Sequence, residues 1–179
     1  RGKCCTFDQN SGMRIAGYWL LTLVFLILVG CEKDDICIAG DAPRWHISFR
    51  DADQPDLAKA PESLWILGLN STKPITTPIP GSSDATEIWL PIDPANDKTT
   101  FNLIAFGVLE NDQLSGAGEQ ISISYSTDPK FLSKACGFIP QFNEVQGTWT
   151  GENKSWIKSV TWTTTQITED ESIHTIIYH

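Results

Sequence analysis

The sequence predicts an all-β fold: a single immunoglobulin-like antiparallel β-sandwich that follows an N-terminal signal segment. After residue 37, apolar residues recur with a period of two, which is the spacing of a half-buried strand rather than that of a helix. These short runs alternate with stretches rich in Pro, Asp and Gly, which are typical of turns. Before residue 31, an uncharged apolar run follows an arginine, and this is the pattern of a secretory signal.

The N-terminal segment divides at Met13, the single methionine of the chain. Met13 lies two residues before the apolar run at residues 15–30, where a signal peptide would begin. We therefore interpret residues 1–12 as upstream read-through and residues 13–30 as the signal peptide. The apolar run is shorter than the roughly 20 residues of a membrane-spanning helix. It is also apolar on every side, which argues against a core helix in a chain that is otherwise β-rich.

The signal segment ends in Leu28-Val29-Gly30-Cys31. This ending resembles the lipobox of bacterial lipoproteins, and the resemblance implies that Cys31 is acylated and becomes the first residue of a lipid-anchored chain. The alternative is an ordinary signal peptide with a cysteine at that place by chance. Two or more acyl chains hold a protein stably on a bilayer, because each buried methylene contributes about 0.8 kcal/mol.

Residues 31–37 are predicted to be an acidic tether, in which Glu32, Lys33, Asp34 and Asp35 follow directly after Cys31. A lysine followed by acids at this place is similar to the surface-export signal of Bacteroidota lipoproteins. The similarity implies an outer-membrane location, with the cell surface favoured over the periplasmic face. A solvated acidic linker without an export role is the alternative interpretation.

Residues 38–179 are predicted to form the sandwich. In the first strand, Trp45, Ile47 and Phe49 alternate with His46 and Ser48, which should face solvent. Further strands are predicted at residues 63–69, 87–92, 101–109, 121–126, 156–167 and 173–178. Turns are predicted at residues 111–118 and 128–129, one helical turn at 129–135 and a hairpin turn at 168–171.

Of the five cysteines, two are predicted to form a disulfide. Cys4 and Cys5 precede the inferred start, and Cys31 takes the lipid. Cys37 and Cys136 are then left to pair in an oxidising compartment. Closing a loop of about 100 residues would stabilise the fold by up to roughly 4.7 kcal/mol.

Charge and motifs exclude several function classes. The formal net charge of −9 argues against a nucleic-acid partner, which clustered Lys and Arg would be needed to bind. The chain has neither a Gly-x-Ser-x-Gly nor a Ser-x-x-Lys motif. His46, His174 and His179 lack zinc spacing and are expected at exposed strand edges. We therefore expect no catalytic residues, no metal and no cofactor.

The tryptophans of the sandwich leave two binding functions open. Trp45 and Trp65 lie on apolar faces and are predicted to be core, whereas Trp89, Trp149 and Trp156 could present indoles to a glycan. Core and inter-sheet packing is the alternative for these three. The leading hypothesis is a non-catalytic lipoprotein that binds an outer-membrane protein or assists envelope assembly, with an edge strand or the C-terminal hairpin adding to a partner. A glycan-binding surface lipoprotein is the alternative, and an enzyme ranks last.

Four segments of the chain carry a family resemblance. They are CEKDDIC at residues 31–37, RWHISFRDAD at 44–53, FLSKACGF at 131–138 and HTIIYH at 174–179. Together they resemble a family of uncharacterised Bacteroidota lipoproteins, across essentially the whole chain after the signal. The resemblance implies an envelope location and the Cys37–Cys136 pair. It implies no activity and lends no catalytic residues.

Overall fold

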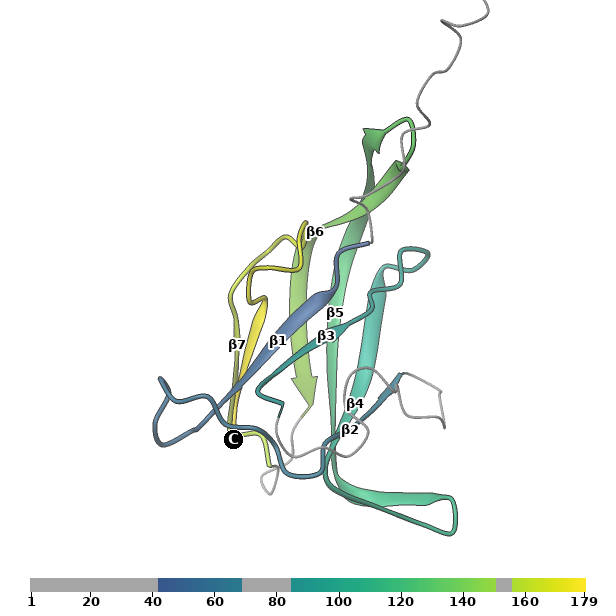
Figure 1. Ribbon diagram of the computed structural model, residues 1–179. Coiled ribbons are helices and arrows are strands. Elements are labelled where there is room, and N and C mark those ends of the chain that lie inside the picture. The colour runs from purple at the N-terminus through teal and green to yellow at the C-terminus, as the bar shows by residue number, and fades with distance from the viewer. Residues whose placement is uncertain (1–41, 69–84, 151–155) are drawn as a thin grey trace, which may run out of the picture. The chain divides into compact units, whose positions relative to one another are not determined.

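The computed structural model describes residues 42–68, 85–150 and 156–179, and these residues form strands and loops without a helix. All of them belong to one unit, Cys37–His179. The predicted signal peptide, Cys31, residues 32–35 and Cys37 lie outside the described residues. The all-β prediction is confirmed, and the strands form two four-stranded, mainly antiparallel sheets, consistent with a β-sandwich (Figure 1).

The first sheet has the strand order β3-β1-β8-β7. Its members are β1 (Trp45–Arg50), β3 (Glu87–Leu90), β7 (Ser159–Trp162) and β8 (Thr175–Tyr178). β1 pairs antiparallel with β3 but parallel with β8, and β8 pairs antiparallel with β7. The last strand of the chain therefore lies inside the sheet, beside the first.

The second sheet has the order β2-β4-β5-β6 and is antiparallel throughout. It contains β2 (Trp65–Gly68), β4 (Lys98–Glu110), β5 (Gln113–Ser133) and β6 (Gly137–Thr150). β4, β5 and β6 follow one another as two hairpins that share β5. Because β5 is 21 residues long, the two hairpin ends lie far apart, at opposite ends of β5 (Figure 1).

The core lies between the inner faces of the two sheets. Trp45, Ile47 and Phe49 are fully buried, as their alternation predicts. The ring of Trp45 lies 6.2 Å from that of Phe101 on β4, which brings β1 against the second sheet. The other core residues of the second sheet include Leu103, Ile121, Ile123, Tyr125 and Phe142. Each large apolar side chain buried in this way contributes about 1.5–3 kcal/mol.

The second face of β1 is also buried, contrary to the sequence prediction. His46 and Ser48 are 4% and 3% exposed. β1 is an inner strand, and the indole of Trp89 on β3 stacks on the His46 ring with centroids 4.5 Å apart. Polar residues of an alternating strand therefore mark a second buried layer here rather than a solvated face.

The predicted turn at residues 111–118 is much shorter in the structure. Only Asn111 and Asp112 form it, with φ angles of 51° and 61°. Two adjacent residues with positive φ are typical of a tight type I′ hairpin turn, and Asn and Asp adopt this conformation more readily than other non-glycine residues. The strand β5 consequently begins already at Gln113.

The predicted turn at Asp128-Pro129 and the predicted helical turn at residues 129–135 are wrong, because β5 continues to Ser133. Beyond Ser124, β5 pairs only with β6. No described strand pairs with its other edge there, so the missing N–H of Pro129 need not interrupt the ladder. Pro129 thus lies within β5 and does not end it, whereas β3 ends at Leu90, directly before Pro91.

The C-terminal region also differs from prediction, since β7 covers only part of the predicted strand 156–167. Ile167 instead bridges to β6, where its N–H donates to the carbonyl of Phe142 at 2.8 Å and its carbonyl accepts from the Phe142 N–H at 3.1 Å. This bridge covers part of the outer edge of β6. The connection between β7 and β8 therefore spans residues 163–174 instead of a tight turn at 168–171.

Candidate functional site

Exposed apolar side chains gather at the ends of the two hairpins. Besides Leu57, the large hydrophobic residues exposed in the described part of the chain are Phe106, Val108, Leu109, Phe131, Leu132 and Phe138. The first three lie towards the β4–β5 turn and the last three around the β5–β6 turn. We name residues 106–114 the β4–β5 tip and residues 130–138 the β5–β6 tip. Gathered exposed apolar groups of this kind mark interaction sites more often than isolated ones do.

The β5–β6 tip carries an exposed pair of phenylalanines. Phe131 and Phe138 are register partners, and their rings lie 5.3 Å apart in an edge-to-face arrangement. They are 55% and 67% exposed. Because β5 extends past its pairing with β4, this end of the hairpin stands beyond the sandwich core (Figure 1).

The turn of the β5–β6 tip is stabilised by a local hydrogen bond and by a disulfide at Cys136. The N–H of Cys136 donates to the hydroxyl of Ser133 at 3.0 Å, and Gly137 has a φ of 69°, which glycine adopts at no steric cost. Cys136 is disulfide-bonded, and the other four cysteines of the chain lie outside the described residues. The Cys37–Cys136 pairing therefore stays a prediction.

The two tips differ in charge. The charged residues of the β5–β6 tip are Lys130 and Lys134, both exposed, whereas those of the β4–β5 tip are Glu110 and Asp112, also exposed. In a chain with a net charge of −9, the β5–β6 tip is thus a local basic exception. Each tip combines an apolar centre with a rim of one sign, and the two signs are opposite.

The structure does not expose the three predicted indoles as one platform. Trp156 is 8% exposed, which agrees with the packing alternative for this residue. Trp89 and Trp149 are half-buried and lie in different sheets. The Trp89 ring stacks on His46, and its N–H donates to the carbonyl of Asp170 at 3.1 Å.

Trp149 lies within β6, opposite Ile121 of β5. Its N–H donates to the Glu119 carboxylate, which also accepts the N–H of Ile157 at 3.2 Å. Glu119 on β5 is only 7% exposed. This buried carboxylate satisfies two donors and attaches the segment after residue 155 to the second sheet.

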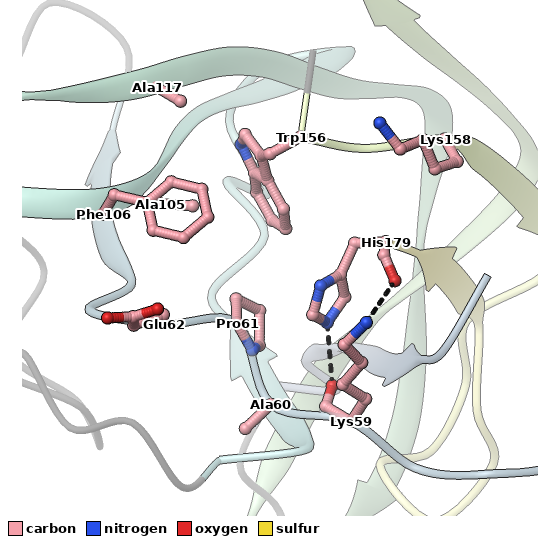
Figure 2. A pocket seen from close by; sticks show the side chains of 10 residues that line it. All are labelled: Lys59, Ala60, Pro61, Glu62, Ala105, Phe106, Ala117, Trp156, Lys158 and His179. Carbon is pink, nitrogen blue, oxygen red and sulfur yellow. Dashed lines mark hydrogen bonds between the residues drawn. The ribbon is translucent and has the colours of Figure 1, made fainter. Parts of the chain in front are cut away.

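A cavity of about 500 Å³ lies beside Trp156 (Figure 2). Its lining residues are Lys59, Ala60, Pro61, Glu62, Ala105, Phe106, Ala117, Trp156, Lys158 and His179. The His179 imidazole donates to the Lys59 carbonyl at 2.9 Å, and the Lys59 ammonium donates back to the His179 carbonyl at 3.1 Å. Burial lowers the pKa of His179, which favours its neutral form.

The lining of this cavity combines an aromatic ring with charged side chains. Among the described residues that line it, none is a Ser, Thr or Cys that could serve as a hydroxyl or thiol nucleophile. Within the described residues, the indole N–H of Trp156 has no hydrogen-bond partner. An indole beside amine and carboxylate groups is a surface on which a small polar ligand could stack and form hydrogen bonds.

His46 and His174 form a buried pair that contradicts the expectation of exposed histidines. The backbone N–H of His46 donates to Nδ1 of His174 at 3.0 Å, so the proton of the neutral His174 ring is on Nε2, 3.2 Å from the Ser172 hydroxyl. Burial, and then the neighbouring His46, lowers the pKa of His174 to about 4. Nδ1 of His46 lies 3.1 Å from the Ser172 carbonyl, and its Nε2 lies 3.2 Å from the Glu87 carboxylate.

The histidine pair joins the segment before β8 to β1, which is a structural role.

No group of three or more His, Cys, Asp or Glu side chains placed to hold a metal ion occurs among the described residues. The carboxylate of Asp51 accepts hydrogen bonds from the N–H groups of Asp53 and Gln54, and it forms an ion pair with the Lys59 ammonium at 3.0 Å. Within the described ranges, no helix is long and apolar enough to cross a membrane.

The model of one protein family, "Family of unknown function (DUF6452)", matches residues 63–179. The chain belongs to this family. The match covers β2 to β8 and both hairpin tips. No curated protein and no solved structure matches the chain. Membership therefore assigns no activity, and the DUF6452 chain must be interpreted from its own geometry.

Proposed function

We propose that this DUF6452 protein is a lipid-anchored, non-catalytic lipoprotein of the outer membrane that binds an envelope protein through its β4–β5 tip. The observation that carries the proposal is the exposed apolar group Phe106, Val108 and Leu109 at the end of a hairpin. Apolar side chains at the centre of a patch with a charged rim are the usual composition of a protein–protein contact. The acidic rim of Glu110 and Asp112 suits a partner with basic residues around an apolar surface.

The predicted mode of contact changes with the topology. Of the C-terminal hairpin, only the edge strand β7 could accept an added strand, because β8 is an inner strand paired on both sides. Part of the outer edge of β6 is bridged by Ile167. The exposed apolar side chains at the hairpin tip favour a contact through side chains over an added strand.

The location rests on the N-terminal sequence. The apolar run at residues 15–30, the lipobox-like ending at Cys31 and the acids after it support a cleaved lipoprotein signal peptide and an outer-membrane anchor. The acidic segment from Glu32 to Asp35 supports the cell surface over the periplasmic face. These features also support the proposal that the protein is a lipoprotein from Bacteroidota.

The immunoglobulin-like type of the sandwich is likewise a proposal. Two four-stranded, mainly antiparallel sheets support it, whereas the parallel β1–β8 pair and the β4-β5-β6 meander are its unusual features. A crystal structure superimposed on immunoglobulin domains tests this assignment. Failure of the two sheets to superimpose on those of immunoglobulin domains would reject it.

Glycan binding is the second candidate, and one observation favours it. The cavity beside Trp156 places an indole next to Lys59, Glu62 and His179. Envelope glycans added to the protein should then change its tryptophan emission, and Trp156→Phe should remove that change while the fold persists. An equal emission change in wild type and variant would reject this cavity as the site.

The protein-binding proposal is tested by cross-linking from the tip. A photoreactive amino acid at Leu109, in the full chain in intact bacteria, should form an adduct with a specific envelope protein. The same group at Ser124, which is exposed on β5 away from both tips, is the matched control. The charge reversals Glu110→Lys and Asp112→Lys should reduce the Leu109 adduct. Identical adducts from both positions, or no adduct from Leu109, would reject the proposal.

A further inference from the structure

We infer that the β5–β6 tip is a second membrane contact: its phenylalanines insert into the lipid headgroup region beside the lipid anchor. This inference rests on the proposed function, because it takes Cys31 as the acylated residue. It assigns opposite roles to the two tips. The β5–β6 tip faces the bilayer, and the β4–β5 tip points away from it towards the protein partner.

The first support is the composition of the tip. Phe131, Leu132 and Phe138 are its exposed apolar side chains, and Lys130 and Lys134 flank them. Aromatic and aliphatic groups with lysines at their rim are the composition of interfacial membrane segments, in which the lysine amines reach the lipid phosphates. The acidic β4–β5 tip lacks this feature, since anionic lipid would repel Glu110 and Asp112.

The second support is the distance from the anchor. Cys136 lies at the turn of the tip and is disulfide-bonded. With Cys37 as its predicted partner, only five residues lie between Cys31 and the cysteine of that disulfide. A chain of this length spans at most about 20 Å. Since the two Cα atoms of a disulfide are about 5.5 Å apart, the turn would be held within roughly 25 Å of the acyl chains.

The third support is the length of β5. β5 runs from the turn of one tip to the turn of the other over 21 residues, which corresponds to about 70 Å of extended strand. The β5–β6 tip can thus touch the bilayer while the β4–β5 tip stands well clear of it. Apolar side chains exposed near an anchor lose their contact with water by entering the headgroup region, to a depth of about 5–10 Å.

The test measures the depth of an indole placed at each tip. The full, acylated protein carrying Phe138→Trp or Leu109→Trp is reconstituted into vesicles of phosphatidylcholine and phosphatidylglycerol, with the phosphatidylcholine brominated near its headgroup end. Emission of the parent protein is subtracted. We expect quenching of the added emission to be at least about twofold stronger at position 138 than at 109. Equal quenching at the two positions, or none at 138, would overturn the inference.

Two double variants test the roles of the lysines and of the disulfide separately. Lys130→Glu with Lys134→Glu should weaken the quenching of the indole at position 138, as should Cys37→Ala with Cys136→Ala. Quenching unchanged by both pairs of substitutions would contradict the roles of the lysines and the tether. In intact bacteria, a photoreactive group at Phe138 should react with lipid, and a single protein adduct there would overturn the lipid assignment.

The same preparation distinguishes this inference from the proposed function. If the purified protein carries no acyl group and does not remain with vesicles, the lipoprotein proposal fails, and this inference fails with it. If the protein is acylated and remains with vesicles while the indole at position 138 is not quenched, only this inference fails.

Discussion

At the scale of single residues, buried polar groups determine how the segments after residue 155 attach to the sheets. His174 accepts the N–H of His46, and Glu119 accepts the N–H groups of Trp149 and Ile157. These roles could not be predicted from the sequence, because a polar residue in an alternating strand is ordinarily assigned to solvent. Its burial depends on which distant segment covers it.

Acidification should destabilise the protein through His174. Burial lowers its pKa to about 4 from an ordinary value of 6.5, so the unfolded chain binds the proton more readily than the folded one. The stabilising contribution is complete above about pH 6.5 and is lost as the pH falls towards 4. Urea unfolding at pH 7 and pH 4.5 should show a loss of about 2 kcal/mol from this group.

His174→Asn is the matched control for this titration. Its amide oxygen can still accept the His46 N–H, but the side chain does not titrate. The variant should lose less stability on acidification than the wild type. The same pH dependence in both proteins would show that His174 is not the responsible group.

Removing the Glu119 carboxylate should be costly. Glu119→Ala leaves two buried N–H donors without their acceptor, which should lower the free energy of unfolding by about 2–4 kcal/mol. Glu119→Gln keeps one acceptor oxygen and should fall between wild type and alanine in chemical denaturation. A loss below about 0.5 kcal/mol for Glu119→Ala would mean that water satisfies these donors.

At the scale of elements, the sequence predicted the positions of most strands but not their lengths. The alternation of residues 45–50 and 121–126 identified two core strands correctly, since its period matches the inner face of a sheet. It could not reveal that β5 continues to Ser133, because exposed hairpin ends have no inner face to impose a pattern. The paired phenylalanines around Lys134-Ala135-Cys136-Gly137 were the available signal for the β5–β6 tip.

The contact between β6 and β7 depends on a missing side chain. A Cβ built at Gly147 would lie 2.1 Å from the indole of Trp162, whereas one at Gly118 would lie 3.6 Å from its nearest neighbour. Gly147→Ala must therefore displace Trp162, which also stacks on Trp45 with centroids 6.1 Å apart. We expect Gly147→Ala to lower the free energy of unfolding by about 1–3 kcal/mol.

Gly118→Ala is the control for this substitution, because ordinary van der Waals contact accommodates the added methyl group. It should be neutral or slightly stabilising, since alanine loses less conformational freedom than glycine on folding. Equal thermal or chemical stability of the two variants would refute the close packing of Trp162 on β6.

At the scale of the whole molecule, the structure describes a β-rich unit with exposed apolar groups at both ends of its longest strand. The disulfide at Cys136 would fix one end of this unit to the beginning of the mature chain. Alkylation with and without reductant should modify Cys37 and Cys136 only after reduction. Loss of the bond through Cys136→Ala should lower stability, by up to roughly 4.7 kcal/mol for a loop of about 100 residues.

The central claim, a lipoprotein anchored through Cys31, is tested most directly by the intact mass of the protein purified from bacterial membranes. We predict a chain that begins at Cys31 and carries the added mass of a diacylglyceryl group. Cys31→Ala should remain an uncut precursor or leave the membrane as a soluble protein. An unmodified N-terminus at another residue, or a mature-sized Cys31→Ala protein that stays with the membranes, would contradict the claim.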